Sequence, residues 1–143
     1  MSDGMIRELT FIAQIFLSVL LGALIGFERE RVKKPAGVRT YILVSLGSCL
    51  ISIISSYSGT LFSEFAVDPT RIASQLLTGI GFIGAGVIMK KGDHVEGITT
   101  AAGLLVACGI GMAIGFGMYI IGIATTLITW LILLSLHILK HEQ

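Results

Sequence analysis

The residues of this chain that could do chemistry form a few short groups. Gly79, Gly81 and Gly84 have the spacing GxGxxG, with which a dinucleotide-binding domain cradles a pyrophosphate. That chemistry needs a preceding strand and a soluble helix, whereas these glycines lie inside a long apolar run. We therefore expect them to serve a tight helix crossing or, as the alternative, a local unwinding of residues 79–86 that exposes backbone groups inside a membrane.

Acidic side chains and a histidine fall together in the segment 90–97. Asp93, His94 and Glu96 could bind a divalent cation weakly, but a solvated loop accounts equally for their positions and is the interpretation we favour. The three histidines of the chain have no nucleophile, base and orienting acid that could join them in one site. We expect a protein that is not an enzyme and has no cofactor, and we assign no metal site.

The composition places these groups in a membrane protein. Hydrophobic residues make up 54% of the 143 residues and charged residues 13%, about half the share that is typical of a soluble domain. Five apolar runs have about the 20 residues that cross a bilayer, and a turn at residues 115–117 separates the last two. The predicted spans are residues 9–27, 38–57, 72–89, 98–114 and 116–139.

The fold class that follows is an all-α membrane protein, a single domain over residues 1–143 without a C-terminal soluble domain. Its five transmembrane helices would form one bundle, because backbone groups in lipid must be paired within the chain. Eight of the ten lysines and arginines would share the side of the C-terminus, and only Arg7 and Arg71 the other side. The positive-inside rule therefore places the N-terminus outside and the C-terminus inside.

Small and polar residues recur at helical spacing on three of the spans, where they would let helices pack closely. The serines could instead line a narrow hydrated path, although packing is the favoured interpretation. The three stripes are Gln14, Ser18, Gly22 and Gly26; Ser45, Ser48, Ser52 and Ser55; and Thr99, Gly103, Ala107, Gly111 and Gly115.

The ionisable residues lie at the span edges, and none lies in the middle of a span, which disfavours an ion pump. Arg39 enters the second span, and we expect Glu28 or Glu30 to pair with it, unless these charges are solvated anchors. Arg71 and Gln75 share a face of the third span, which we expect to be buried in protein or to line a cavity that suits an anion or a small solute. Asp68 and Pro69 read as the N-cap and first residue of that helix.

Several ordered motifs resemble the MgtC family, also called MgtC/SapB, of bacterial inner-membrane proteins. The segments that carry the resemblance are LGALIGFERE at 21–30, PAGVRT at 35–40, DPTRIASQ at 68–75, the glycine-rich third span, and GITTAA at 97–102. The family often has a tryptophan soon after the alanine pair of the last motif, and this chain has Gly103, Leu104 and Leu105 there. The family's functional positions fall on Glu28, Arg29, Arg39, Thr40, Asp68, Arg71, Gln75, Thr99 and Thr100, and its packing glycines on Gly22, Gly26, Gly79, Gly81, Gly84, Gly86, Gly97 and Gly103.

The resemblance implies an inner-membrane protein that supports magnesium homeostasis and growth in low magnesium, and that is associated with virulence in pathogens. We expect it to act by regulating another membrane complex, such as the F-type ATP synthase; the alternative is a transporter or channel for magnesium or a small solute. The expected partners are membrane lipid and a second copy of the chain in a homo-oligomer, with a dimer favoured. We expect no nucleic-acid partner.

Overall fold

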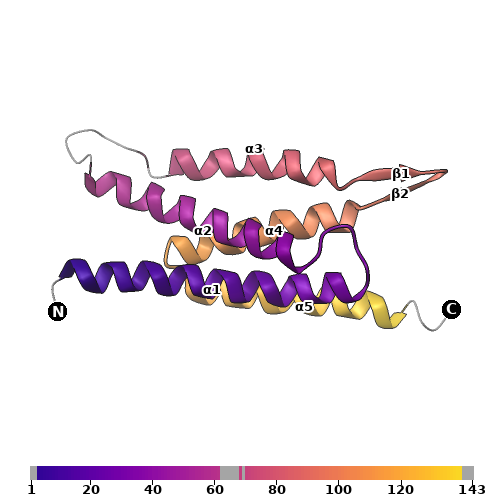
Figure 1. The fold of residues 1–143 in the computed structure, drawn as a ribbon, viewed down its shortest axis with the longest axis horizontal. Helices are drawn as coiled ribbons and strands as arrows, with labels where there is room; N and C mark the ends of the chain where they lie inside the picture. Colours follow the sequence, from indigo (N-terminus) through magenta and orange to yellow (C-terminus); the bar gives the residue numbers. More distant parts are fainter. Residues whose placement is uncertain (1–2, 62–67, 69, 140–143) are drawn as a thin grey trace.

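The computed structural model describes residues 3–61, 68 and 70–139. In this part of the chain the helices lie alongside one another, and Figure 1 shows the α1–α2 loop and the β-hairpin at the same end of the molecule. We call this the hairpin end. The elements are α1 (Asp3–Arg31), α2 (Val38–Leu61), α3 (Thr70–Gly86), β1 (Met89–Lys91), β2 (His94–Glu96), α4 (Ile98–Gly115) and α5 (Tyr119–Leu139).

The five predicted helices are therefore present among the described residues, and three of them are long and apolar enough to cross a membrane. These three are α1, α2 over Val38–Ser58, and α4. The helix α3 has 17 residues, and the apolar segment of α5, Tyr119–Ser135, is also shorter than the three.

The last two helices are separated by the predicted turn. The α4 helix ends at Gly115, Gly117 has a φ of 78°, and the amide of Met118 donates to the carbonyl oxygen of Ala113 over 2.8 Å. This left-handed residue reverses the chain at low cost only if it is glycine. The structure corrects the start of α5 from residue 116 to Tyr119, because residues 116–118 form the turn.

The end of the third helix also differs from the prediction. Helix α3 continues without interruption to Gly86 and stops there, so residues 79–86 are not unwound. Residues 87–89 lead into β1, which pairs antiparallel with β2, so a β-hairpin replaces the expected loop. Gly97 follows β2 and has a φ of 95°. A Cβ on Gly97 would also collide with the carbonyl oxygen of Val87. Glycine is required there for both reasons.

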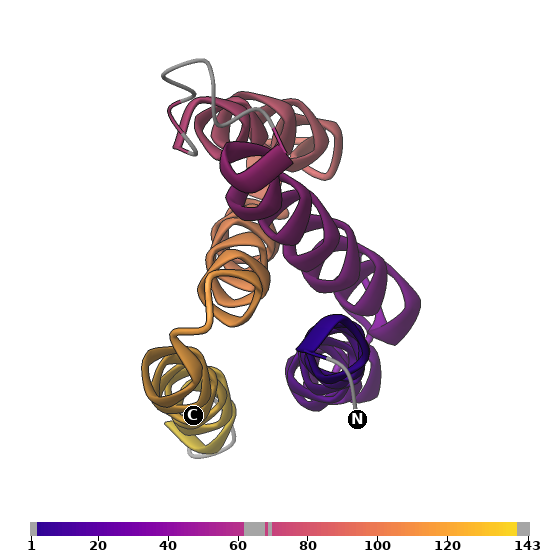
Figure 2. The ribbon, with the colours of Figure 1, turned by 90° about the vertical axis from the view of Figure 1, so that its left-hand side faces the viewer.

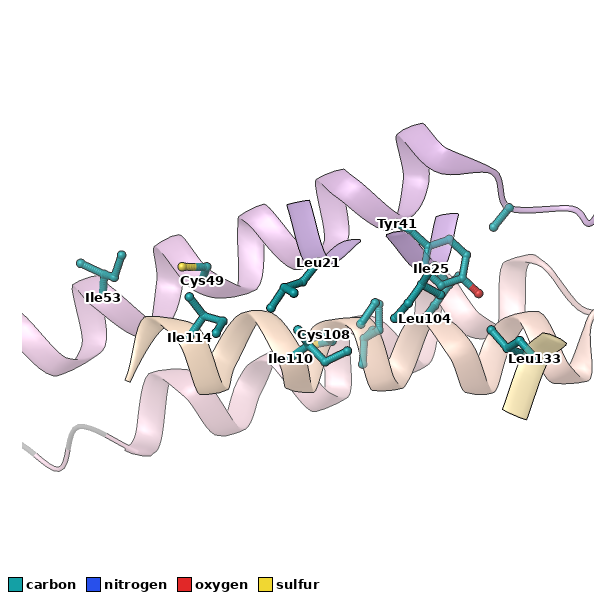
Figure 3. Packing of buried hydrophobic residues seen from close by; sticks show 13 residues of the cluster. Leu21, Ile25, Tyr41, Cys49, Ile53, Leu104, Cys108, Ile110, Ile114 and Leu133 are labelled. Atoms are coloured by element: carbon teal, nitrogen blue, oxygen red, sulfur yellow. The ribbon is translucent and has the colours of Figure 1, made fainter. Parts of the chain in front are cut away.

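Helix α4 lies at the centre and packs against α2 through its small residues (Figure 2). A Cβ on Gly111 would collide with the backbone oxygen of Ser45, and one on Gly115 would lie 2.5 Å from that of Cys49. The backbones thus approach as closely as small residues permit. Figure 3 shows Ile110 and Ile114 of α4 on the same side as Cys49 in the resulting apolar core.

Helix α1 approaches α2 in the same manner at the hairpin end. A Cβ on Gly26 would lie 2.6 Å from the Cα of Val38, and one on Gly22 would lie 2.8 Å from the backbone oxygen of Tyr41. These two glycines therefore pack against α2 of the same chain.

The four serines of the α2 stripe, at positions 45, 48, 52 and 55, are buried. The Ser45 hydroxyl donates to the backbone oxygen of Ser18 over 2.9 Å, and the Ser48 hydroxyl donates to that of Val44 over 2.7 Å. Ser48 also lies 3.2 Å from the sulfur of Cys108. Of the two alternatives, helix packing and a hydrated path, these two serines fit helix packing, because their hydroxyls bond to neighbouring backbone and side-chain atoms.

Gly111→Ala is expected to lower the free energy of unfolding by about 1–3 kcal/mol, because the added methyl group pushes α4 away from α2. The matched control is Gly109→Ala on the same helix, where a Cβ meets no atom within 4 Å. The control should leave stability unchanged or raise it by up to about 1 kcal/mol, since alanine favours the helix. Unfolding in mixed micelles, followed by circular dichroism, measures both; equal losses would contradict the close approach.

Candidate functional site

Two oppositely charged side chains are buried together at the last turn of α1. The guanidinium Nη1 of Arg29 lies 3.5 Å from the carboxylate Oε2 of Glu28, and the side chains are 5% and 6% exposed. The Nε of Arg29 is buried without a hydrogen-bond partner in the described part of the chain. A buried charge is costly unless an opposite charge accompanies it, so neither residue is a solvated anchor.

Tyr41, in the first turn of α2, connects this pair to α4. Its ring is fully buried, and its hydroxyl lies 3.4 Å from the carbonyl oxygen of Thr100, to which it donates a hydrogen bond. The phenol occupies the space that a side chain on Gly103 would fill. Figure 3 shows the ring beside Ile25 of α1 and Leu104 of α4. Three helices therefore meet at one aromatic side chain.

The sequence analysis did not identify Tyr41 as part of the site. The available signal was the alignment of small residues: a glycine on α1 and a glycine on α4 both face the first turn of α2 and leave room for one large residue there. Tyr41 packs against α1 three residues before Arg29, because a Cβ on Gly26 would lie 3.1 Å from the Cβ of Tyr41. We call Glu28, Arg29, Tyr41 and Thr100 the buried cluster.

The expected pairing of Arg39 with an acid of α1 is not what the structure shows. The carboxylate of Glu28 faces Arg29, and the Oε2 of Glu30 accepts a hydrogen bond of 2.8 Å from the backbone amide of Val38. Glu30 thus caps the start of α2, where amides lack partners within the helix. The side chain of Arg39 is exposed.

The polar residues of α3 lie outside the bundle, contrary to the expectation that they are buried or line a cavity. Arg71, Gln75 and Thr78 are all exposed, because α3 turns its opposite side toward α2 and α4. The backbone oxygen of Asp68 accepts a hydrogen bond of 3.2 Å from the amide of Arg71. Pro69, the expected first helical residue, lies outside the described residues.

The glycines of α3 follow the same division. Gly84 is buried, and a Cβ there would lie 3.5 Å from the Cβ of Ala101 on α4. Gly79, Gly81 and Gly86, which we expected at a helix contact, have open space where a Cβ would stand. Within one chain only Gly84 of the four brings α3 close to α4.

The family positions are thus separated into two groups at opposite ends of the molecule. Glu28, Arg29 and Thr100 belong to the buried cluster at the hairpin end, whereas Arg71 and Gln75 lie near the start of α3 at the other end (Figure 1). Thr40 is half-buried near the cluster. Thr99 is exposed beside the buried Thr100.

The β-hairpin is a solvated element. Its side chains are exposed, and the Nζ of Lys91 lies 2.9 Å from the Oε2 of Glu96. The hydrogen bond and positive charge of Lys91 lower the pKa of Glu96 below its ordinary value, and Lys34 of the α1–α2 loop adds to this. The described residues contain no group of three histidine, cysteine or acidic side chains that could hold a metal ion.

Glu28→Gln is expected to lower the free energy of unfolding by about 3–5 kcal/mol, because it leaves the Arg29 charge buried without an opposite charge. Glu8→Gln, the same substitution at an exposed position of α1, is the control and should change stability by less than about 0.5 kcal/mol. Unfolding by denaturing detergent measures the difference. Equal stability of the two variants would show that the carboxylate of Glu28 does not compensate Arg29.

The family model described as the MgtC family matches residues 15–142. The chain is 42% identical over 130 residues to "Putative magnesium transporter YhiD" of Escherichia coli (strain K12), an alignment that covers 89% of this chain and 60% of the relative. It is 46% identical over 94 residues to "Protein MgtC" of Salmonella typhimurium (strain LT2), which covers 66% of this chain and 38% of the relative.

"Protein SapB" of Bacillus subtilis (strain 168) is 40% identical over 90 residues, which cover 60% of this chain and 39% of the relative. The chain therefore spans between 38% and 60% of the length of these relatives. No solved structure gives a significant match. The match to the family model over nearly the whole length, together with these identities, shows that the chain belongs to the MgtC family.

Proposed function

We propose that this chain is a non-enzymatic protein of the bacterial inner membrane that supports magnesium homeostasis by regulating another membrane complex. Family membership and the name of the relative YhiD support the connection to magnesium. The observation that carries the regulatory part is the outer face of α3, defined by Arg71, Gln75, Thr78, Phe82 and Gly86.

All five helices cross the membrane in this proposal, with the N-terminus outside and the C-terminus inside. The basic residues of the α1–α2 loop and of the β-hairpin lie at one end of the molecule, as the positive-inside rule requires (Figure 1). The 17 residues of α3 span about 26 Å, close to the hydrocarbon thickness of about 30 Å, which supports a membrane crossing by this helix as well.

The outer face of α3 is poorly suited to lipid. Gln75 and Thr78 lie one and two turns below Arg71 on the same side of the helix and are exposed. Arginine in the first turn can extend its charge to the membrane surface, but the amide of Gln75 gains no hydrogen bond from hydrocarbon chains. Phe82 on the same face is 84% exposed. A face that combines polar groups, a large aromatic ring and glycine is typical of contacts between membrane helices.

The partner that this face would contact is another membrane complex, for which the F-type ATP synthase is the example that we propose to test. A second copy of the chain is the other partner we propose, with a dimer as the favoured assembly. The stripes that contain Gly22 and Gly103 do not support that dimer, because both glycines already pack against α2 of the same chain. In this proposal a homo-oligomer uses the outer face of α3 instead.

Vesicles that contain F-type ATP synthase together with this chain should pump protons severalfold more slowly on addition of ATP than vesicles with the synthase alone. Gln75→Leu should restore most of the rate, because it removes a hydrogen-bonding group from the outer face of α3. The measurement is quenching of a pH-sensitive dye. The control is Thr10→Ala at an exposed position of α1, which should inhibit as the original chain does; equal inhibition by Gln75→Leu would reject α3 as the contact.

Transport is the second candidate, and one observation favours it. Two buried polar atoms of the helix contacts, the Oε1 of Gln14 and the Oγ of Ser52, have no hydrogen-bond partner in the described part of the chain. Both side chains lie next to Gly115. The Nε2 of Gln14 is 3.5 Å from the backbone oxygen of Gly115, and a Cβ on Gly115 would lie 2.6 Å from the Cβ of Ser52. Buried polar groups without a protein partner are commonly bonded to ordered water, and a hydrated path would supply that water.

Sealed proteoliposomes that hold a magnesium-sensitive dye distinguish the two candidates. We expect no magnesium entry above that of protein-free vesicles, because the glycine contacts between α2 and α4 leave no space along the serines. Entry that depends on the protein and falls severalfold in both Ser52→Ala and Gln14→Ala would replace the regulatory proposal with transport.

A further inference from the structure

An apolar groove lies between α2 and α3 on the outside of the bundle. Its volume is about 420 Å³, within the range of sites that hold small molecules. We call it the α2–α3 groove. Its walls include Leu43, Gly47 and Ile51 of α2 and Leu76, Gly79 and Ile83 of α3.

The groove is open because two glycines replace side chains on its walls. A Cβ on Gly47 or on Gly79 would meet no atom within 4 Å. The floor includes Ser48 and Cys108, and the Ser48 hydroxyl is bonded to the carbonyl oxygen of Val44 and to the Cys108 sulfur. With its hydroxyl bonded in this way, the floor offers an occupant little beyond apolar contact.

The length of the groove corresponds to one leaflet of a bilayer. From Thr40 to Ile51, both of which line it, α2 rises about 16 Å. The hydrocarbon of a bilayer is about 30 Å thick, so one leaflet takes half of that. A groove that starts at the hairpin end and stops near mid-membrane accepts the acyl chain of a lipid from the leaflet at that end.

A positive charge stands at the entrance of the groove. Arg39 precedes Leu43 by one turn of α2, and Leu43 precedes Gly47 by another, so the guanidinium continues the row of residues that forms one wall. Arg39 is exposed, and the two nearby acids of α1 are occupied, Glu28 with Arg29 and Glu30 with the amide of Val38. Lys90 of the hairpin, which directly follows α3 in the chain, adds a second cation at the same end.

We propose that the α2–α3 groove binds an anionic phospholipid, with one acyl chain between α2 and α3 and the headgroup phosphate at Arg39. The fold places an apolar groove next to a cation, Arg39, at its entrance. The groove matches the acyl chain of a phospholipid, and the cation matches its phosphate. The inference rests on the membrane topology given in the proposed function, and it is independent of the partner of α3. It gives Arg39 and Thr40 a role at the edge of a lipid site.

Native mass spectrometry of the full chain released from detergent tests the headgroup contact. With equal amounts of phosphatidylglycerol and phosphatidylcholine, which have the same acyl chains, the original chain should retain one phosphatidylglycerol preferentially. Arg39→Ala should lower that preference about fivefold, the effect of one basic residue near an anionic headgroup. Arg31→Ala removes an equally exposed cation from the end of α1 and is the matched control. Equal losses in the two variants would overturn the site at Arg39.

A second pair of variants tests the groove. Gly47→Leu places a side chain in the slot and should lower retention of both lipids severalfold, while Gly109→Leu, on an open face of α4 outside the groove, should retain them. Both variants should fold, because a Cβ at either position meets no neighbouring atom. Retention by Gly47→Leu equal to that of Gly109→Leu would overturn the acyl-chain site.

These outcomes are distinct from failure of the proposed function. Lipid retention does not require magnesium or the ATP synthase, so a chain that has no effect on proton pumping can still show the lipid preference. A chain that is recovered from cells without detergent would contradict the membrane topology, and with it the lipid site.

Discussion

Helices α2 and α4 pack so closely that glycines of α4 stand against carbonyl oxygens of α2. At Gly111 and Gly115 there is no room for a side chain. In lipid, where apolar surface gains little from leaving its surroundings, such contacts supply van der Waals energy that bulkier residues cannot provide. Other polar features depend on the same close approach: the Ser48 hydroxyl reaches the sulfur of Cys108 on α4, and Tyr41 of α2 fits against α4 because position 103 is glycine. The bond from the Ser45 hydroxyl to the backbone oxygen of Ser18 depends instead on the contact between α2 and α1.

The same contacts divide the small residues into two sets. Five glycines of α1 and α4 pack within the chain, whereas three glycines of α3 have open space beside them. The five are Gly22, Gly26, Gly103, Gly111 and Gly115. Helix α3 packs mainly against α2 and α4, and Figure 2 shows it at one side of the molecule, far from α1 and α5. The exposed polar residues of α3 therefore lie on a helix at the edge of the bundle, as expected of an element that takes part in contacts outside the chain.

Much of the fold could be predicted from the sequence because it depends on local properties. Apolar runs gave five helices, and Gly115 and Gly117 marked the turn between the last two. The orientation of each helix about its own axis could not be predicted, because periodicity shows that residues share a face without showing which neighbour that face meets. This is why Arg71 and Gln75 were expected inside and lie outside. Likewise, Glu28 and Glu30 were both near Arg39 in sequence, but the folded loop directs them to Arg29 and to the start of α2.

The α2–α3 groove lies beside the helix that carries the exposed polar residues Arg71 and Gln75. An acyl chain in it would touch both helices, so its presence would affect where α3 lies relative to α2 and how the outer face of α3 is presented. Two sites that share a movable element are coupled, and the coupling is reciprocal. If the first ligand changes the affinity of the second by some factor, the second changes the affinity of the first by the same factor. A partner that moves α3 toward α2 must therefore weaken lipid binding, and one that holds the groove open must strengthen it. The buried cluster, held between α1, α2 and α4, supplies the fixed side against which such a movement would take place.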